Sequence, residues 1–325
     1  MSHRESLVEY LTSLEQIGIK LGLAQIRALL DHLGHPETAL PAVVVAGTNG
    51  KGSVTAMVER GLRAAGRRTG RYTSPHLVRL EERFAIDGVS LSPEAFDAIA
   101  AKVRVAAARL ASPPTFFEAT TAIALEAFRE ARVDVAVLEV GLGGRLDATN
   151  AVDGVAVAIT AIDFDHQEFL GDTIEAIAAE KAGVIKPGAV VVLGENPRAV
   201  EGVIGRRCGE VGARLVRAAD GVASDVELRD GVTRLSLATP RASYGPLVLG
   251  LRGRHQVQNA ITAVRLLEEM PAIAGGPMAA AAVRAALETV VWPARLESAR
   301  WRGHAVLVDG AHNPAGARAL QSYLA

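Results

Sequence analysis

The chain contains almost no cysteine, and its charges nearly cancel. Among 325 residues there is a single cysteine, Cys208, so no disulfide can form within the chain and no cysteine-based metal site can be built. Lysine and arginine together number 35, against 36 aspartates and glutamates, which gives a formal net charge of −1. This balance provides no overall attraction to nucleic acid or to an anionic membrane, and we expect neither as a partner.

Long apolar runs are also missing. No run approaches the roughly 20 residues that a membrane-spanning helix requires. The first 16 residues are polar and lack the apolar centre of a signal peptide. We therefore expect a cytoplasmic, monomeric protein. Because 49% of the residues are hydrophobic, the chain can bury a core that suits one large α/β domain or two ordinary ones.

Apolar strands alternate with helical periodicity along most of the chain. Continuous apolar runs predict buried strands at residues 41–47, 134–141, 154–162 and 189–194. Helical spacing is found at residues 7–17, 26–33, 54–65, 93–110, 117–131, 173–182, 256–269 and 279–287. This alternation predicts an α/β fold with a central, mostly parallel sheet covered on both faces.

The pattern changes in the last third of the chain. Residues 214–251 contain short alternating segments, which predict a small antiparallel sheet added to the parallel one. A strand at 304–311 and a helix from residue 314 to the end then form a strand–helix pair with no following strand. Such a pair cannot bury its own sheet edges, so we expect a second domain to begin here and to be incomplete.

The strongest local signal is AGTNGKGS at residues 46–53, between a predicted strand and a predicted helix. Gly47, Gly50 and Gly52 let the backbone curl so that successive N–H groups point at one anion. Lys51 adds a positive charge, and the hydroxyl of Ser53 can bind Mg²⁺. The helix that follows directs the positive end of its dipole at the same place. The segment therefore predicts a nucleotide-phosphate loop.

The spacing differs from the common GxxxxGK[ST] form because a glycine separates Lys51 from Ser53. In this respect the loop resembles that of the Mur-ligase superfamily of ATP-dependent amide ligases. Further motifs resemble the folylpolyglutamate synthases of that superfamily, in the same order: TSPHL (73–77), LEVGLGGRLDATN (138–150), DHQEFLGDT (165–173), EKAGVIKPG (180–188), HQVQNA (255–260), WPARLE (292–297) and DGAHNP (309–314). The resemblance covers essentially the whole chain.

The resemblance implies a fold and an activity. Residues 1–296 would form the ATP-binding domain with a P-loop, and residues 297–325 the beginning of a Rossmann-like C-terminal domain. The implied enzyme is a bifunctional dihydrofolate synthase/folylpolyglutamate synthase. It would use ATP and Mg²⁺ to add L-glutamate to dihydropteroate, to tetrahydrofolate polyglutamates, or to both. The substrate carboxylate would first be phosphorylated, and the acyl phosphate would then be attacked by the amine of glutamate.

The resemblance also assigns nucleotide and catalytic residues. The implied ATP contacts are Gly47, Thr48, Asn49, Gly50, Lys51, Gly52, Ser53, Asn259, Arg295 and Asp309. Arg295 has a physical reason of its own, because a guanidinium makes paired hydrogen bonds to phosphate. His312 would lie near the phosphates and the incoming glutamate. Catalysis would involve Lys51, His312 and Lys181.

The metal ligands are assigned in part by physical reasoning. Glu139 lies in an otherwise apolar predicted strand, and a buried, unpaired carboxylate is costly, so it needs a cation or a donor. The resemblance makes it a Mg²⁺ ligand together with Ser53, Ser74 and His166. Lys181 would be carbamoylated, which would add a carboxylate that supports the metal site.

The pteroate side of the site is implied by FFEATT at residues 116–121 and by LDATN. Phe117 would pack on the pteroate ring system, and Asp147 could hydrogen-bond in the same pocket. An aromatic residue at the start of a helix is also a common core residue. The segment 22–26 departs from the family pattern, because Gln25 stands where arginine is common.

Two other functions stay open. Another amino-acid ligase of the Mur superfamily would share the phosphate loop and the lysine, although TSPHL and GGRLDATN argue against it. A truncated nucleotide-binding protein without turnover is the second alternative, because an incomplete C-terminal domain would leave the ATP cleft half-walled. The sequence also leaves open which of the two glutamylation activities is present, and the length and linkage of the glutamate chain.

Overall fold

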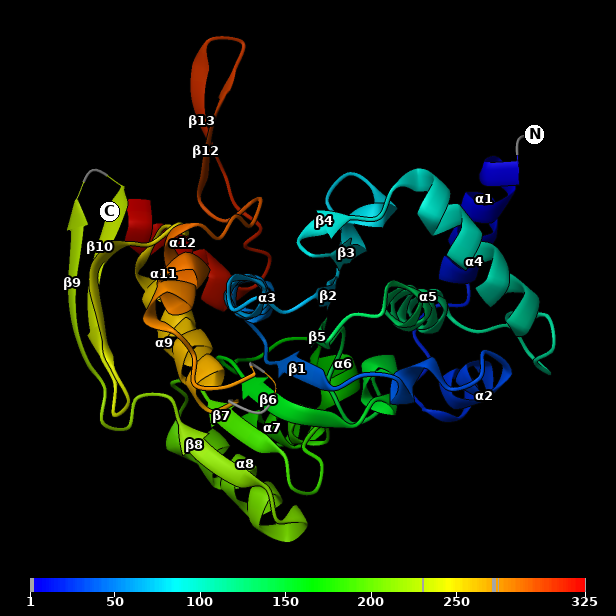
Figure 1. Cartoon of the computed structure of the whole chain (residues 1–325), viewed down its shortest axis with the longest axis horizontal. Helices are drawn as coiled ribbons and strands as arrows, with labels where there is room; N and C mark the ends of the chain where they lie inside the picture. Colours follow the sequence, from blue (N-terminus) through cyan, green and yellow to red (C-terminus); the bar gives the residue numbers. More distant parts are fainter. Residues whose placement is uncertain (1–2, 230, 271–272, 274, 325) are drawn as a thin grey trace.

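A computed structural model describes residues 3–229, 231–270, 273 and 275–324 (Figure 1). Its centre is an eight-stranded sheet with the strand order β4-β3-β2-β5-β1-β6-β7-β8. The strands are β1 (Ala42–Ala46), β2 (Thr69–Tyr72), β3 (Phe84–Ile86), β4 (Val89–Ser90), β5 (Val135–Glu139), β6 (Gly154–Ile159), β7 (Val190–Leu193) and β8 (Arg214–Arg217). Six neighbouring strands, from β2 to β8, are parallel, and β3 and β4 add an antiparallel edge.

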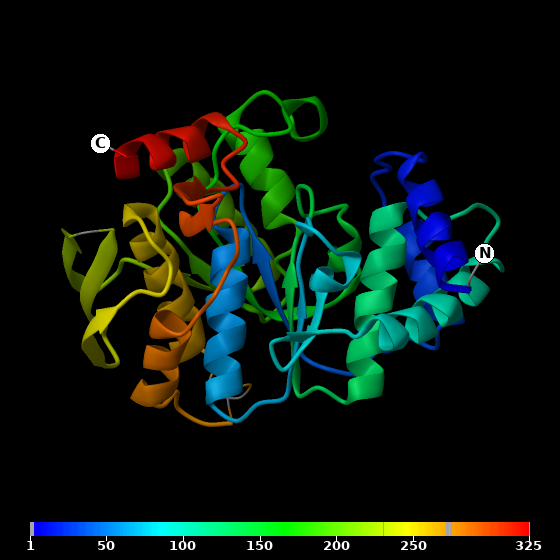
Figure 2. The same cartoon turned by 90° about the horizontal axis from the view of Figure 1, so that it is seen from above.

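Helices cover both faces of this sheet, as the periodicity predicts. Successive residues of β1 point to opposite faces: Val43 and Val45 contact the core under α3, α9 and α11, whereas Val44 and Ala46 contact the core under α7 and α8. A third core lies on the side of β2, β3 and β5, under α1, α2, α4 and α5. Figure 2 shows these layers from above. The helices are α1 (His3–Glu15), α2 (Ala24–His32), α3 (Lys51–Ala64), α4 (Pro93–Ala107), α5 (Phe116–Ala131), α6 (Gln167–Leu170), α7 (Ile174–Ala182), α8 (Arg198–Val211), α9 (Arg254–Glu268) and α11 (Ala280–Glu288).

A three-stranded antiparallel sheet follows, with the order β11-β10-β9. Its strands are β9 (Ala223–Arg229), β10 (Val232–Ala238) and β11 (Ser243–Val248). Leu235, Leu237 and Leu247 join the core cluster that also contains α9 and α11. The prediction of a small antiparallel sheet is confirmed, except that residues 214–217 do not belong to it. They pair in parallel with β7 as the last strand of the central sheet.

The last segment contains β12 (Glu297–Trp301), β13 (His304–Val308) and α12 (Pro314–Leu324). The strand predicted at 304–311 ends at Val308 and pairs with β12 as an antiparallel hairpin, which Figure 1 shows projecting from the rest of the molecule. The hairpin was not predicted, because β12 is wholly exposed and carries no clear apolar pattern. The helix after residue 314 is confirmed. The domain boundary at residue 297 stays a prediction.

The predicted strands and helices are found within a few residues of their expected ends, with one difference that matters for the site. The helix expected at 54–65 begins at Lys51, inside the phosphate loop. Strands β2, β3 and β4 and helix α8 were not predicted, since short segments such as Thr69–Tyr72 are defined by their pairing rather than by an apolar pattern. None of the described helices is both long enough and apolar enough to cross a membrane.

The parallel arrangement places the carboxyl ends of β1, β2, β5, β6 and β7 at one edge of the sheet. The predicted phosphate-loop and metal residues lie at these ends or in the segments that follow them. In open α/β sheets this edge is where ligands bind.

Candidate active site

The phosphate loop leaves β1 and runs directly into α3. The backbone N–H groups of Thr48 and Asn49 both donate to the carbonyl oxygen of Ala161, at 2.8 and 3.1 Å, so these two are not directed at an anion as expected. The N–H groups of the first turn of α3 have no intrahelical acceptor, because a helix leaves its first donors unpaired. The anion-binding end of this loop is therefore the N-terminus of α3, which begins at Lys51.

Gly50 turns the chain into this helix with a φ of +87°, a conformation that L-residues with side chains rarely adopt. A Cβ atom at this position would lie 2.3 Å from Oδ1 of Asn259, on α9. The glycine therefore allows both the turn and the close approach of α9 to the loop.

The loop opens into a cleft of about 500 Å³ at the carboxyl edge of the sheet. The cleft brings together residues that are far apart in the sequence. Of the predicted nucleotide, metal and catalytic residues, it is lined by Thr48, Asn49, Gly50, Lys51, Gly52, Ser53, Ser74, Glu139, His166, Lys181, Asn259, Arg295, Asp309 and His312. Gly47 does not line the cleft. Its carbonyl oxygen, however, accepts hydrogen bonds from Lys51 and Lys181, which do line it.

Glu139 ends β5 and is only 5% exposed. Its carboxylate accepts the N–H of Ser74 at 3.2 Å. Burial raises the pKa of Glu139, while the charges of Lys51, Arg295 and Arg71 act in the opposite direction. Because burial disfavours its negative charge, a carboxylate at the edge of the cleft is suited to binding a cation there.

Lys51 and Lys181 converge on one acceptor, the carbonyl oxygen of Gly47, with Nζ–O distances of 3.2 and 2.9 Å. Lys181 lies on α7 and is 4% exposed. Burial, and then the neighbouring charge of Lys51, lower the pKa of Lys181 to about 7. A substantial share of the Lys181 side chains is therefore neutral and nucleophilic at neutral pH.

Helix α9 contributes a short chain of side-chain hydrogen bonds to the loop. Gln256, 1% exposed, donates from Nε2 to the hydroxyl of Ser53 at 3.2 Å and accepts from Asn259 Nδ2 at 2.9 Å. This orients both the candidate metal ligand Ser53 and the candidate base contact Asn259. Gln256 was not singled out from the sequence, although it lies in the HQVQNA motif.

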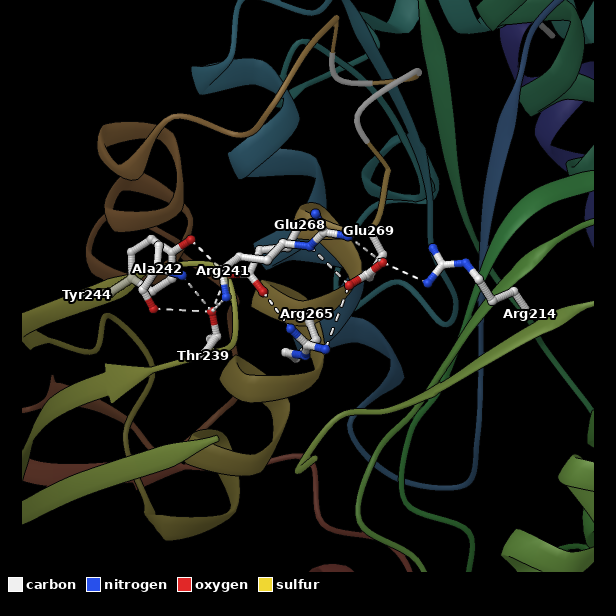
Figure 3. A network of polar contacts seen from close by, with 8 residues as sticks. All are labelled: Arg214, Thr239, Arg241, Ala242, Tyr244, Arg265, Glu268 and Glu269. Atoms are coloured by element: carbon white, nitrogen blue, oxygen red, sulfur yellow. Dashed lines mark hydrogen bonds and ion pairs between the residues drawn. The ribbon is translucent and has the colours of Figure 1, made fainter. Parts of the chain in front are cut away.

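The opposite end of α9 is fixed by a network of ion pairs and hydrogen bonds (Figure 3). Glu268 accepts from Thr239, Tyr244 and Arg265, and Glu269 accepts from Arg241 and is paired with Arg214. Burial and the hydrogen bond to Glu268 raise the pKa of Tyr244, so it stays a donor. The network thus ties α9 to the antiparallel sheet and to β8.

The C-terminal segment closes one side of the cleft. Asp309 accepts the N–H groups of Leu296 and Ala311, both at 2.9 Å, so its carboxylate also organises the local backbone. Two side-chain contacts reach across to the loops of the central sheet: Asn313 donates to Asn49 at 3.1 Å, and Arg318 pairs with Asp163 at 2.8 Å. Asn313 and Asp163 were not singled out from the sequence, although the first lies in DGAHNP and the second lies three residues before His166.

A second, mostly apolar cleft of about 320 Å³ lies beside the first and shares Gly141 and Leu142 with it. Phe117 lines it and packs on Tyr72, with 5.9 Å between ring centroids. Asp147 also lines it, but its carboxylate accepts the N–H groups of Gly141 and Leu142 at 3.1 and 2.9 Å. Asp147 therefore shapes the wall between the two clefts.

Glu139, Ser53, Ser74 and His166 offer a carboxylate, two hydroxyls and an imidazole around the phosphate loop. Within the described part of the chain, no three His, Cys, Asp or Glu side chains gather as a metal site. A set with so few anionic ligands does not suit a metal enclosed by protein. It fits Mg²⁺, which keeps several waters and is bound by one or two carboxylates together with substrate phosphates.

The comparisons with known proteins agree with this geometry. The family model described as the Mur ligase middle domain matches residues 45–267. The chain is 38% identical over 330 residues to the dihydrofolate synthase/folylpolyglutamate synthase of Mycobacterium tuberculosis, and the match covers 93% of this chain and 66% of that protein. The chain thus spans slightly less than two thirds of the length of this relative.

Solved structures give the same picture. One is a folylpolyglutamate synthase of Mycobacterium tuberculosis, complexed with ADP and AMPPCP. It superimposes on this chain with a TM-score of 0.90 at 39% identity, and the match covers 99% of this chain and 74% of the synthase chain. A structure described as an FPGS–AMPPCP–folate complex gives a TM-score of 0.92 at 33% identity, with 100% of this chain and 80% of that chain covered.

Proposed function

The chain belongs to the Mur ligase family, in the branch of the dihydrofolate and folylpolyglutamate synthases, and on this premise we propose that it joins L-glutamate to a folate-type carboxylate at the expense of ATP. The observation that carries the proposal is the pair of adjacent clefts. One contains a phosphate loop and the other is apolar and aromatic, and the two share the Gly141–Leu142 wall. A ring system in the second cleft can direct its carboxylate toward the nucleotide in the first.

The reaction requires that a carboxylate oxygen become a leaving group. In the proposed sequence the substrate carboxylate attacks the γ-phosphorus of ATP, ADP leaves, and an acyl phosphate forms. The amine of glutamate then attacks the acyl carbon, phosphate leaves, and the amine loses a proton. Catalysis of such a transfer rests on positioning and charge neutralisation. The N-terminus of α3 and Lys51 supply positive charge where the phosphates would lie.

The remaining nucleotide contacts are proposed on their positions. Asn259 borders the loop from α9, and Arg295 and Asp309 face the same cleft from the C-terminal segment. These three would hold the base, the phosphates and the ribose between them. His312, exposed at the cleft beside Asp309, would lie near the phosphates and the incoming glutamate.

Mg²⁺ would be held by Ser53, Ser74, Glu139 and His166. When bound there, it would neutralise charge on the phosphate oxygens. Glu139 contributes the negative charge, and its burial keeps water from screening that charge.

Lys181 is proposed to carry a carbamate. The neutral amine would add to CO₂, forming an N–C bond and releasing one proton, and the product is a carboxylate. The low pKa of Lys181 supports this, since only the unprotonated amine reacts. The added negative charge would face Lys51, which shares the Gly47 carbonyl with it.

The second cleft is proposed as the pteroate site, with Phe117 packing against the ring system and Asp147 holding the wall beside it. The Mycobacterium relative is named for both a dihydrofolate synthase and a folylpolyglutamate synthase, so both dihydropteroate and reduced folates are candidate substrates. A cytoplasmic, monomeric protein, with residues 297–325 as part of a second domain, stays our prediction from the sequence.

The test is incubation of the purified chain with ATP, Mg²⁺, L-glutamate and either dihydropteroate or tetrahydrofolate, with products read by mass spectrometry and ATP binding measured by calorimetry. A mass gain of one glutamate on either acceptor supports the proposal and identifies the activity. Nucleotide binding without product on either acceptor favours a binding protein without turnover and contradicts the ligase. Absence of both product and binding would overturn the assignment of residues 46–53 as well.

A further inference from the structure

The indole of Trp292 lies directly against the phosphate loop. Trp292 is far from the loop in sequence, in the segment between α11 and β12, and is half-buried. A Cβ atom on Gly52 would lie 2.7 Å from Nε1 and 3.1 Å from Cε2 of this indole. The loop backbone and the ring are therefore in contact, and no side chain fits between them. Gly52 is the residue by which this loop departs from the common GK[ST] spacing.

The indole is also covered by a cation. The guanidinium carbon of Arg71, on β2, lies 4.9 Å from the centroid of the Trp292 ring, a distance at which the ring attracts the cation. Nε of Arg71 is buried and has no hydrogen-bond partner among the described residues. The ring thus faces a guanidinium whose Nε makes no hydrogen bond in the described part of the chain. The charge of Arg71 also opposes the rise that burial causes in the pKa of Glu139, the candidate metal ligand.

Trp292 begins the segment that carries Arg295 into the nucleotide cleft. Ala294 and Leu296 have positive φ values of 54° and 47°, so the backbone bends sharply on both sides of Arg295. The bend is fixed on its far side, where the carbonyl of Ala294 accepts from Gly310 at 2.9 Å and from Arg295 at 2.7 Å. On its near side, Trp292 lies against Gly52 of the phosphate loop.

We propose that Trp292, held in place by Arg71, is a positioning residue that sets the phosphate loop and the Arg295 segment relative to each other. The indole takes the space that a side chain at position 52 would otherwise occupy. This gives the second glycine of GKGS a physical reason: it makes room for an aromatic residue about 240 positions later in the chain. The proposal rests on the function proposed above, since it assumes that the cleft binds ATP.

The chain itself supplies a spectroscopic probe. It has two tryptophans, and Trp301 lies on the exposed hairpin, where it is 60% accessible. In the Trp301→Phe variant, Trp292 is the sole source of tryptophan emission. Titration with ATP and Mg²⁺ is expected to change this emission saturably, with the same midpoint as nucleotide binding measured by calorimetry. Binding that leaves the emission unchanged would overturn the proposal.

A pair of substitutions tests the contact itself. Gly52→Ala is expected to weaken ATP binding about tenfold or more, because the added methyl displaces the indole. Trp292→Leu in the same chain is expected to restore part of the affinity, since a smaller side chain relieves the overlap. The fold-loss in ATP affinity of the double variant is compared with the product of the fold-losses of the two single variants. If the two are equal, the contact does not couple these positions and the proposal fails.

A third comparison separates positioning from a general effect on stability. Arg71→Met is expected to weaken ATP binding about fivefold, and Arg71→Lys, which keeps the cation, to weaken it less. Arg302, which lies 4.4 Å from the ring of exposed Trp301, provides a matched arginine–tryptophan pair outside the cleft. Arg302→Met should leave ATP affinity unchanged. Equal losses in Arg71→Met and Arg302→Met would contradict the proposal, whereas no binding by the unmodified chain would overturn the proposed function and this inference with it.

Discussion

At the scale of single residues, the cleft depends on two lysines that share one acceptor. Lys51 belongs to the phosphate loop and Lys181 to α7, and both donate to the carbonyl oxygen of Gly47. Burial, and then repulsion by the nearby ammonium group of Lys51, lower the pKa of Lys181. A substantial share of the Lys181 amines, next to Lys51 of the loop, is therefore neutral at neutral pH.

Replacing Lys51 tests the cation. Lys51→Ala is expected to weaken ATP binding by about 10- to 100-fold, or roughly 1.4–2.8 kcal/mol, and to abolish ligation. The thermal midpoint should change little, because this side chain is only half-buried. Lys102→Ala, which removes an exposed lysine paired with Glu130, is the control and should bind ATP normally. Unchanged turnover in Lys51→Ala would remove the phosphate loop from the mechanism.

Replacing Lys181 tests the neutral amine. The pKa of Lys181 in the folded chain, about 7, lies below the ordinary lysine value of 10.5, so the unfolded chain binds more protons between these two values. The contribution of Lys181 to stability therefore rises as pH increases from about 7 toward 10, by up to about 1.4 kcal/mol per pH unit. Below pH 7 the buried charge destabilises the fold.

The prediction concerns the difference between two proteins. The free energy of unfolding of Lys181→Met minus that of the unmodified chain should be larger at pH 6 than at pH 9. Urea unfolding in buffers free of CO₂ measures both values. Lys102→Met, at an exposed site, should show no such pH dependence. A constant difference across this range would mean that Lys181 titrates normally.

At the scale of elements, α9 connects the nucleotide cleft to the antiparallel sheet. Its first turns carry Gln256 and Asn259, and its C-terminus carries Glu268 and the capping residue Glu269, which are held by the network of Figure 3. The network includes Arg214 on β8 and Arg241 between β10 and β11, so one helix end is tied to two sheets. An anchored helix cannot slide, and this keeps its other end in register with the phosphate loop.

The anchor can be tested at Glu269, whose side chain is 5% exposed and which is paired with Arg241 and Arg214. Glu269→Ala is expected to lower the free energy of unfolding by about 2–3 kcal/mol. This is somewhat below the cost of a fully buried pair, because Arg241 and Arg214 are half exposed and the buried Arg265 lies farther away, at 3.7 Å. The hydrogen bond from Arg241 lowers the pKa of Glu269. Its contribution is thus complete above its unfolded value near 4.5 and is lost as pH falls below it.

The matched control is Glu288→Ala, which breaks an i,i+4 pair with Arg284 on the surface of α11, where the glutamate is 30% exposed. Surface pairs of this kind contribute roughly 0–1 kcal/mol. Chemical denaturation of both variants at pH 7 is the measurement. Similar losses in the two would show that the network of Figure 3 does not anchor α9.

At the scale of the whole molecule, the C-terminal segment is held against the central sheet across the nucleotide cleft. Asn313 also caps α12, since its side-chain oxygen accepts the N–H of Gly316 at 2.9 Å. The same side chain donates to Asn49 in the phosphate loop, while Arg318 on α12 pairs with Asp163. These contacts keep Asp309 and His312 on the cleft wall.

Reversing one charge of the Arg318–Asp163 pair should loosen the C-terminal wall of the nucleotide cleft. Arg318→Asp is expected to weaken ATP binding about three- to tenfold, because two aspartates would then face each other. Asp163→Arg in the same chain should recover most of the loss. The control is Arg300→Asp, on the exposed hairpin. If Arg318→Asp and Arg300→Asp weaken ATP binding equally, the Arg318–Asp163 pair does not hold the segment. The same conclusion follows if the variant with both Arg318→Asp and Asp163→Arg shows no recovery. Calorimetric titration with ATP decides the matter.

The strands and the motifs could be predicted because their signals are local. Continuous apolar runs such as residues 41–47 and 134–141 are typical of buried parallel strands, and glycines around a lysine are typical of a phosphate loop. The family resemblance is confirmed by the comparisons. The prediction that residues 214–217 belong to the antiparallel sheet is wrong, because an exposed edge strand carries the same alternation whether it pairs in parallel or antiparallel.

The sequence by itself determined the fold class, the phosphate loop and the family, since each depends on residues close together in the chain. Only the tertiary structure decided which distant side chains meet: Trp292 on Gly52, Gln256 on Ser53, and the two clefts that share one wall. It also showed that the backbone N–H groups of Thr48 and Asn49 donate to the carbonyl oxygen of Ala161. The physical reason is that these contacts depend on strand order and helix placement, which are set by packing of the whole core and leave no trace in local spacing.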